Sequence, residues 1–304
     1  MTEFDRNKWG VSFSIKQCRN FSLSPDDVLK WLIDIGFRRF RLMSYWDEHE
    51  NEKGKLDFKS LDEQIAIINK VGGKISLCLG VRQPRWPENH WPAWALKLEQ
   101  QQRGQAIYKY IEAIARRYKD NPALENYQLE NEALLKSFGK NSDVDRKRLR
   151  SEFKLVKQLD PNKKIIMTTS TSWGIPLRRP IPDIVGFSFY QVMFNNRKNK
   201  YTLSFHKPWL DKLRAGLVKV IWRKRSFIHE LQLEPWGPRA IWEMGRAEQD
   251  KSMDVSQIRK NIRLASSTSL SPIDLWGGEW WYWRMFTKND SMIWQTVQKE
   301  IAMN

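Results

Sequence analysis

The sequence predicts an α/β fold, a single (β/α)8 barrel with an abbreviated fifth helix. Strand-like and helix-like stretches alternate along the 304 residues, and the strand-like stretches number eight. No GxGxxG motif follows the first of them, so an open, doubly wound sheet is not favoured. No linker rich in Pro, Gly or Ser divides the chain, and residues 1–304 are therefore expected to form one domain.

Eight short stretches are expected to form the strands of the barrel, because they are apolar and mostly rich in β-branched or aromatic residues. They are GVSFSI (10–15), RFRLMS (39–44), KISLCLG (74–80), NYQLEN (126–131), KIIMTT (164–169), IVGFSFY (184–190), SFIHEL (226–231) and DLWGGEW (274–280). Parallel neighbours of this kind need a crossover between each pair, usually a helix.

Amphipathic helices are expected between these strands. The first begins with Ser24 as N-cap and Pro25 at the first helical position. The helices then repeat apolar residues at helical spacing, which suits the covering of a sheet. These positions are Val28, Leu32 and Ile35; Leu61, Ile65 and Ile68; Ile107, Ile111 and Ile114; and Leu149, Phe153 and Val156, before a final helix from about Ser291 to Ile301. Prolines in the segment 170–183 leave no room for a full fifth helix.

Composition excludes several classes of protein. No apolar run approaches the roughly 20 residues of a membrane span, and the N-terminal stretch MTEFDRNKWG lacks the apolar segment of a signal peptide, so we expect a cytoplasmic protein. Cys18 and Cys78 are the only cysteines, with no CxxC and no Cys/His spacing of a metal site. We therefore expect no disulfide framework, no metal and no cofactor.

The positive charge of the chain is concentrated in one region. The net charge is +17, and residues 136–225 hold 22 Lys and Arg against 6 Asp and Glu, which leaves +1 for the rest. Such a region could attract nucleic acid or an anionic membrane surface. Its runs lack interleaved aromatic residues and a nucleic-acid motif, which favours a solvated outer face.

Two glutamates are expected to meet at the open end of the barrel, where the carboxyl ends of the strands carry catalytic residues. Glu132 follows Asn131 at the end of the fourth strand, and Glu230 lies at the end of the seventh. Cleavage of a glycosidic bond needs two carboxyl groups in unlike environments, one protonated and one ionised. The alternative for each is a salt-bridged structural acid. Glu130 and Glu279 are the competitors for these roles. We expect Glu130 to lie deeper and to anchor a basic partner within the barrel, and Glu279 to bind a sugar hydroxyl.

Further side chains at strand ends or in the following loops are candidates for substrate binding. Indole offers a flat apolar face with one donor, which suits stacking on a sugar, although about half of the tryptophans are expected to be packing residues. A lone histidine is more often structural, and a buried arginine often only satisfies its neighbours. The candidates are Arg41, Tyr190, Trp46, Trp86, His90, Trp236, Glu279 and Trp280.

The chain resembles the clan A glycoside hydrolases, retaining β-glycosidases built on a TIM barrel. The resemblance is carried by residues 36–65, by residues 77–95 and above all by the Asn131-Glu132 pair. It implies that Glu132 is the acid/base, that Asn131 binds the 2-hydroxyl of the sugar, and that Glu230 is the nucleophile.

The resemblance also gives roles to the neighbours of these residues. It implies that Arg41 and Tyr190 orient the nucleophile, and Arg41 would keep Glu230 ionised. Ala133 and His229 depart from the residues that the clan commonly has beside its glutamates, but neither departure removes an essential group.

The function implied is that of an O-glycosyl hydrolase acting on β-linked glycosides or oligosaccharides. The expected mechanism is double displacement, with the two carboxyl groups about 5 to 5.5 Å apart. Repulsion from Glu230 would raise the pKa of Glu132. Two alternatives stay open: a non-catalytic glycan-binding barrel, and a protein that binds a polyanion or an anionic surface through residues 136–225. The sugar, its linkage, endo or exo action, transfer to acceptors other than water and the oligomeric state also stay open.

Overall fold

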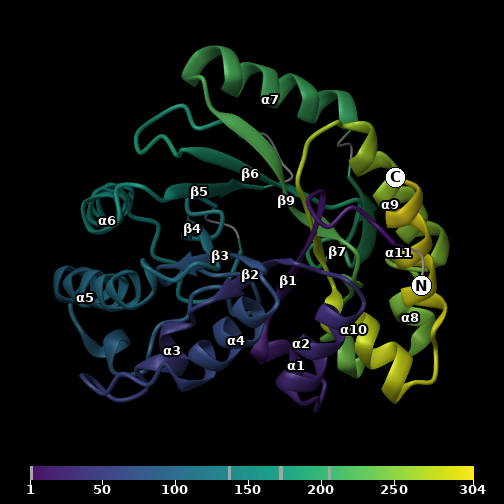
Figure 1. Ribbon diagram of the computed structural model, residues 1–304, viewed down its shortest axis with the longest axis horizontal. Coiled ribbons are helices and arrows are strands. Elements are labelled where there is room, and N and C mark those ends of the chain that lie inside the picture. Colours follow the sequence, from purple (N-terminus) through teal and green to yellow (C-terminus); the bar gives the residue numbers. More distant parts are fainter. Residues whose placement is uncertain (1–2, 136–137, 171–173, 205–206) are drawn as a thin grey trace.

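Eight parallel strands close into a barrel in the computed structural model, which describes residues 3–135, 138–170, 174–204 and 207–304 (Figure 1). The strands are β1 (Trp9–Phe13), β2 (Arg39–Met43), β3 (Lys74–Leu79), β4 (Leu124–Leu129), β5 (Lys164–Thr169), β6 (Ile184–Phe189), β9 (Arg225–Gln232) and β10 (Ile273–Trp276). Their order around the barrel is β1-β10-β9-β6-β5-β4-β3-β2. The predicted (β/α)8 fold is confirmed.

A two-stranded antiparallel hairpin interrupts the barrel sequence after β6. It consists of β7 (Val192–Asn195) and β8 (Lys200–Leu203), paired from Val192 with Leu203 to Asn195 with Lys200. The sequence does not predict this hairpin, because each strand has only four residues and the turn between them is a run of polar and basic residues. It follows directly on the carboxyl end of β6 and so belongs to the open mouth of the barrel.

The helices lie outside the barrel strands (Figure 1). They are α1 (Ile15–Asn20), α2 (Pro25–Asp34), α3 (Trp46–His49), α4 (Lys59–Lys70), α5 (Gln100–Tyr118), α6 (Arg146–Leu159), α7 (Pro208–Trp222), α8 (Arg246–Asp250), α9 (Val255–Ser267), α10 (Gly278–Tyr282) and α11 (Met292–Met303). Short 3-10 turns span Ala95–Lys97 and Ile241–Glu243, and a π-helical turn spans Trp283–Thr287. The Ser24 side chain caps α2 by accepting a hydrogen bond from the backbone N–H of Asp27.

The predicted helical faces are those that cover the barrel. Val28 and Leu32 of α2 are fully buried, as are Ile107 and Ile111 of α5, because their spacing places them on the face toward the strands. The described residues between β5 and β6, namely 170 and 174–183, contain no helix, and the abbreviated fifth crossover is confirmed. In the described part of the chain, no helix combines the length and apolar character needed to cross a membrane.

The eighth strand is shorter than predicted. The sequence analysis expected residues 274–280 to form one strand, but β10 ends at Trp276 and the chain continues into α10. Gly277 causes this change, since its φ of 139° is disfavoured for other residues. Glu279 therefore lies on a helix beside the mouth rather than at the end of a strand.

We predict that Gly277→Ala destabilises the fold by more than about 2 kcal/mol, because it combines a strained φ with a backbone clash. A Cβ atom at this position would lie 2.5 Å from the carbonyl oxygen of Leu233. Gly104→Ala in α5 is the matched control, since no atom lies within 4 Å of the added Cβ. It should stabilise the protein by about 0.5 to 1 kcal/mol. Urea unfolding of both variants measures the two effects, and equal midpoints would contradict the prediction.

Candidate active site

Arg41 is the organising side chain at the mouth of the barrel. It lies on β2, is fully buried, and donates hydrogen bonds to Glu230 Oε2 at 2.6 Å, Gln128 Oε1 at 2.7 Å and Asn131 Oδ1 at 3.0 Å. Burial alone lowers the pKa of its guanidinium, but the Glu230 carboxylate outweighs burial and the pKa is raised. A permanent positive charge therefore lies beside Glu230.

Glu230 is held from two sides. Arg41 contacts one carboxyl oxygen, and the hydroxyl of Tyr190, which follows β6, donates to the other at 2.5 Å. Burial raises the pKa of the Tyr190 hydroxyl well above its usual value, and the charge of Glu230 raises it further, so this hydroxyl keeps its proton. The two donors fix the orientation of the carboxylate, which the predicted nucleophile requires.

Glu132 lies at the same mouth in a different environment. Its side chain accepts a hydrogen bond from Ser188 at 2.8 Å, and Ser188 is the residue of β6 that pairs with Glu230 in register. Burial raises the pKa of Glu132 to about 7, and the charge of Glu230 adds to the rise. Among the described residues, no cation forms a hydrogen bond with the Glu132 carboxylate. The two glutamates thus have the unlike environments that acid and nucleophile need.

The backbone that carries Glu132 is strained. Glu130 and Glu132 have φ values of 48° and 44°, in the left-handed region that non-glycine residues rarely adopt. The backbone N–H of Glu132 donates to the hydroxyl of Thr168 on β5 at 2.7 Å, which holds the turn in place. Strain of this kind persists where the surrounding structure fixes it, and it recurs at functional sites.

Asn131 links the two halves of the site. Its side-chain oxygen accepts from Arg41 and, at 3.1 Å, from the hydroxyl of Thr168, while its nitrogen donates to Glu88 Oε2 at 3.2 Å. The amide is therefore oriented by three partners on three other segments of the barrel. Asn131 therefore lies beside the hydrogen-bond network that holds Glu230.

Glu130 does not enter the barrel. Its carboxylate accepts hydrogen bonds from the backbone N–H groups of Val81 and Arg82, and Arg148 of α6 lies 3.7 Å away. The predicted basic partner exists, but it lies on a helix outside the strands, so the expected location within the barrel was wrong. The left-handed turn at Glu130 rotates its side chain outward.

Glu88 is a third carboxyl group that the sequence analysis missed. It lies in the loop after β3 and is 6% exposed. Burial raises its pKa to about 8, and the charges of Glu230 and Glu132 add to the rise. The available signal was a single acid among the prolines and tryptophans of WPENHWP, which does not distinguish a site residue from a loop residue.

A second ion-pair network borders the first. Arg85, from the loop after β3, pairs with both Glu234 and Glu279, the latter at 2.9 Å. Its guanidinium lies 4.0 Å from the ring centroid of Trp276, and Glu279 also accepts from the backbone N–H of Ser14 at 2.5 Å. Glu279 is fully buried and its oxygens are engaged, so it acts as a structural anchor for Arg85 in this arrangement.

Aromatic residues flank one side of the mouth. Trp236 contacts Tyr190 edge to face at 5.4 Å between ring centroids, and Phe138 contacts both Trp236 and Trp86. Trp86 is 57% exposed and Trp236 is half-buried, so both present surface to a ligand. Phe138 was not among the sequence candidates, since it lies in a long loop without a strand to locate it.

The remaining candidates lie in the interior. Trp46 packs on Tyr110, and Trp280 donates its indole N–H to Gln249, so both are core residues with no exposed face. His90 is also fully buried, 3.5 Å from Asp47 and in ring contact with Tyr45. The structure does not bring these three side chains to the mouth.

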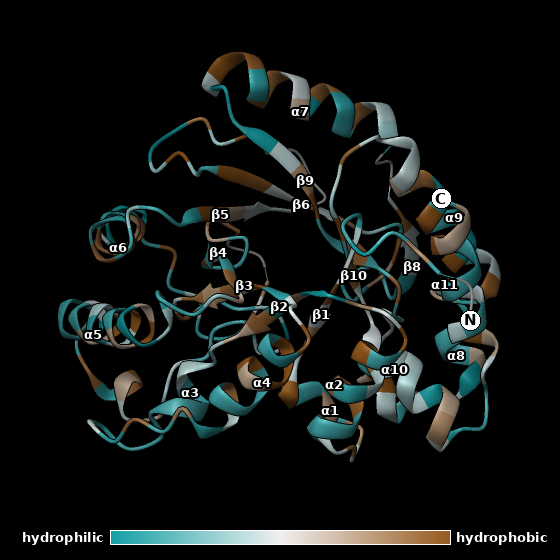
Figure 2. Ribbon diagram, in the orientation of Figure 1, coloured by the Kyte–Doolittle hydropathy of each residue, from teal (hydrophilic) through white to brown (hydrophobic). Residues whose placement is uncertain are grey.

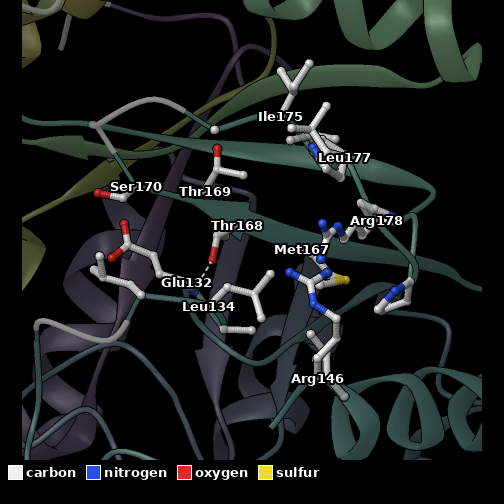
Figure 3. Close-up of a pocket in the computed structure, with 18 residues that line it drawn as sticks. Glu132, Leu134, Arg146, Met167, Thr168, Thr169, Ser170, Ile175, Leu177 and Arg178 are labelled. Atoms are coloured by element: carbon white, nitrogen blue, oxygen red, sulfur yellow. Dashed lines mark hydrogen bonds between the residues drawn. The ribbon is translucent and has the colours of Figure 1, made fainter. Parts of the chain in front are cut away.

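A cavity of about 370 Å³ opens beside Glu132, on the outer side of β5 (Figure 3). Its walls are largely apolar and include Leu134, Met167, Ile175 and Leu177. It occupies the place where the abbreviated fifth crossover supplies a loop instead of a helix. Figure 3 shows the Glu132 carboxylate at one end of the cavity and the guanidinium groups of Arg146 and Arg178 toward the other.

No group of three or more His, Cys, Asp or Glu side chains with the geometry of a metal site occurs in the described ranges. Cys18 and Cys78 are both buried and unpaired. His229, beside Glu230, is buried against Asp274 at 2.5 Å, and burial lowers its pKa, so the imidazole is neutral.

The comparisons with known proteins identify the fold. No family model and no curated protein matches the chain. Among solved structures, an endo-β-1,4-xylanase of family 10 from Gloeophyllum trabeum has a TM-score of 0.66 at 11% identity, covering 99% of this chain and 100% of that one. The chain shares its (β/α)8 barrel fold with this glycoside hydrolase.

Two further structures support the same fold. Xylanase 10B from Thermotoga petrophila RKU-1, solved with xylobiose, has a TM-score of 0.63 at 13% identity and covers 97% of this chain and 95% of that one. A β-galactosidase from Halorubrum lacusprofundi has a TM-score of 0.58 at 13% identity, and the match covers 88% of this chain but only 52% of that one. The chain thus spans about half the length of the β-galactosidase.

We predict that the free energy of unfolding falls less at alkaline pH in Glu88→Gln than in the wild-type protein. Because the folded-state pKa of Glu88 is about 8, above its value in the unfolded chain, the folded protein binds more protons between these values and its stability falls as pH rises. The variant, which keeps an acceptor for Asn131, should lose less stability between about pH 5 and about pH 9, by on the order of 3 kcal/mol.

Urea unfolding across this pH range measures the difference between wild type and Glu88→Gln. Glu63→Gln is the control, since Glu63 is an exposed carboxylate on α4. The control should follow the wild-type curve. Identical pH dependence of Glu88→Gln and wild type would show that Glu88 is not held in its neutral form.

Proposed function

We propose that this protein is a retaining glycoside hydrolase that cleaves β-linked glycosides or oligosaccharides with Glu230 as nucleophile and Glu132 as acid/base. The observation that carries the proposal is that two carboxyl groups in unlike environments lie at the same mouth of the barrel. Glu230 is fixed by Arg41 and Tyr190, while the pKa of Glu132 is raised to about 7. A structural ion pair would not need this asymmetry.

In the first step, a carboxylate oxygen of Glu230 attacks the anomeric carbon as the bond from that carbon to the leaving oxygen breaks. Glu132 gives its proton to the leaving oxygen, so the departing group leaves as a neutral alcohol. An ester bond now joins Glu230 to the sugar. The positive charge of Arg41 and the hydroxyl of Tyr190 hold the attacking group in one orientation, which lowers the entropic part of the barrier.

In the second step, water attacks the anomeric carbon from the side that the leaving group vacated. Glu132, now ionised, takes a proton from that water, and the bond from the sugar to Glu230 breaks to restore the carboxylate. The charge on Glu230 is neutralised while the ester exists, so the pKa of Glu132 falls at the stage where it must act as a base. Both glutamates return to their starting states.

Binding is assigned to side chains at the mouth, of which Asn131 is buried and the aromatic residues are more exposed. Asn131 is oriented for a sugar hydroxyl, and Trp86, Phe138 and Trp236 offer aromatic surface along one side. The apolar cavity adjoins Glu132, which would protonate the leaving oxygen, so we assign the cavity to the leaving group. The proposal does not assign sugar stacking to Trp46 or Trp280.

Hydrolysis of a panel of β-linked aryl glycosides and oligosaccharides tests the proposed function. Glu230→Gln should reduce kcat to near the uncatalysed rate, and Glu132→Gln should reduce kcat/KM by roughly 10²- to 10⁴-fold for substrates whose leaving group needs a proton. Glu234→Gln is the control for loss of a buried carboxylate, since Glu234 pairs with Arg85 outside the catalytic pair. Full activity of either catalytic variant would refute the assignment.

The pH dependence of kcat/KM provides a second test. Glu132 must be protonated to act as acid, so activity should fall as pH rises above about 7, with an alkaline limb that reports its pKa. In Glu230→Gln the repulsion is removed, so the pKa of Glu132 should move below 7 while burial keeps it above the usual value of a glutamate. Carboxyl NMR titration of labelled glutamate measures the shift. An unchanged pKa would mean that the two carboxyl groups do not interact.

A further inference from the structure

Helix α7 has an unusual orientation relative to the barrel. The side that faces the strands carries an ion pair, Asp211 with Arg214 at 2.9 Å, together with Val218, and all three residues are buried. The opposite side carries Trp209 and Val220, which are 64% and 80% exposed. A helix that only covers the barrel would bury its apolar residues and expose its charges. The exposed apolar residues on the outer side of α7 therefore indicate a binding surface.

The exposed apolar residues form a continuous stripe. Trp209, Leu213 and Val220 lie within about 40° of one another on a helical wheel, and the buried face lies on the opposite side. Leu217 and Ile221 widen the stripe, at 37% and 53% exposure. Figure 2 shows hydrophobic residues on α7, which lies at the rim of the molecule. Apolar side chains gathered in this way mark a contact surface more often than scattered ones do.

Cationic residues lie along the stripe. Lys212 and Lys219 project roughly 90° from its centre on the helical wheel, and Lys207 precedes the helix. Asp211 is the one acidic residue in the α7 sequence, and it is buried against Arg214. The outer surface of α7 therefore combines apolar and positive character with no exposed acidic side chain of its own.

An open hollow adjoins the carboxyl end of α7, with a volume of about 390 Å³. Four cationic residues line it, namely Lys219, Arg223, Lys224 and Arg225. Lys224 is paired with Asp183 at 3.2 Å, and no ion pair or hydrogen bond is found for the other three side chains in the part of the chain that the structure describes. A hollow of this composition suits the phosphate of a lipid headgroup.

We propose that α7 binds the surface of an anionic lipid bilayer, with its apolar stripe in the interfacial region and its cations on the lipid phosphates. A helix with Trp and Leu on one face and Lys beside them is the arrangement that lies in a membrane interface. A second copy of the chain is a poorer occupant of this surface. Each molecule has a net charge of +17, and contact between two α7 helices would place their cationic side chains close together.

The position of α7 leaves the candidate active site free. The helix runs along the side of the barrel, from the segment after the hairpin at the mouth to the start of β9 at the opposite end. Neither Glu132 nor Glu230 lies on α7 or in the basic hollow. Binding to a membrane through this surface would therefore hold the mouth beside the bilayer without covering it. This inference does not depend on the proposed hydrolase activity.

Vesicle flotation of the full chain tests the proposal. The protein should float with vesicles of equal parts phosphatidylcholine and phosphatidylglycerol, bind at least tenfold less to phosphatidylcholine alone, and dissociate as salt is raised. The double variant Lys219→Gln/Arg223→Gln should weaken binding by roughly 5-fold per cation, about 1 kcal/mol each. Val220→Glu should weaken it by at least tenfold, because it places a negative charge in the apolar stripe.

The matched control is Lys147→Gln/Lys154→Gln on α6, which removes the same charge from exposed positions elsewhere in the basic region. This control should bind within about twofold of wild type. Inorganic phosphate should not compete, since a single anion does not engage the stripe. The proposal is overturned if the control loses binding equally, if no variant of α7 changes binding, or if wild type does not float. A dimer in solution that Val220→Glu dissociates would also overturn it, because the stripe would then be a contact between copies.

Discussion

The hydrogen bonds of Arg41 are the constraint on which the candidate site depends. This buried guanidinium joins β2 to Glu230 on β9 and to Gln128 and Asn131 at the end of β4, so three distant parts of the chain share one cation. An unpaired charge at this depth would be strongly unfavourable. The Glu230 carboxylate and the two amide oxygens therefore have to remain hydrogen-bonded to Arg41. The barrel closes around Arg41, and the same closure brings the two glutamates to one mouth.

Burial, reinforced by electrostatic repulsion among three carboxyl groups, gives the site its asymmetry. Glu230 has Arg41 as its cation, whereas buried Glu88 and half-buried Glu132 form no ion pair among the described residues, and their pKa values are raised to about 8 and about 7. With pKa values raised in this way, Glu88 and Glu132 are suited to hold a proton at neutral pH. The two glutamates at the mouth thus differ through their neighbours, since their side chains are chemically the same.

The basic region of the chain has two structural roles. Part of it is internal: Arg148 of α6 is buried beside Glu152 at 3.2 Å and Glu130 at 3.7 Å. Another part surrounds the outward apolar stripe of α7, where Lys219 and Arg223 have no acidic neighbour within ion-pair distance among the described residues. A purely solvated face would account neither for the buried Arg148 nor for the cations beside the apolar stripe of α7. The charge matters where it lies next to apolar surface, because there the two attractions act on the same partner.

The sequence by itself determined the barrel and the helical faces, because hydrophobic period and the order of strands along the chain can be read locally. It also placed Glu132 and Glu230 near the carboxyl ends of two barrel strands. Only the tertiary structure decided which neighbours share a site. Burial placed Trp46 and His90 in the core, and a left-handed turn at Glu130 sent its side chain outward. Glu88 lies at the site because of the course of the loop after β3, and the sequence of this loop has no helical or strand periodicity from which that course could be predicted. These outcomes depend on contacts between distant segments, and such contacts have no signature in sequence spacing.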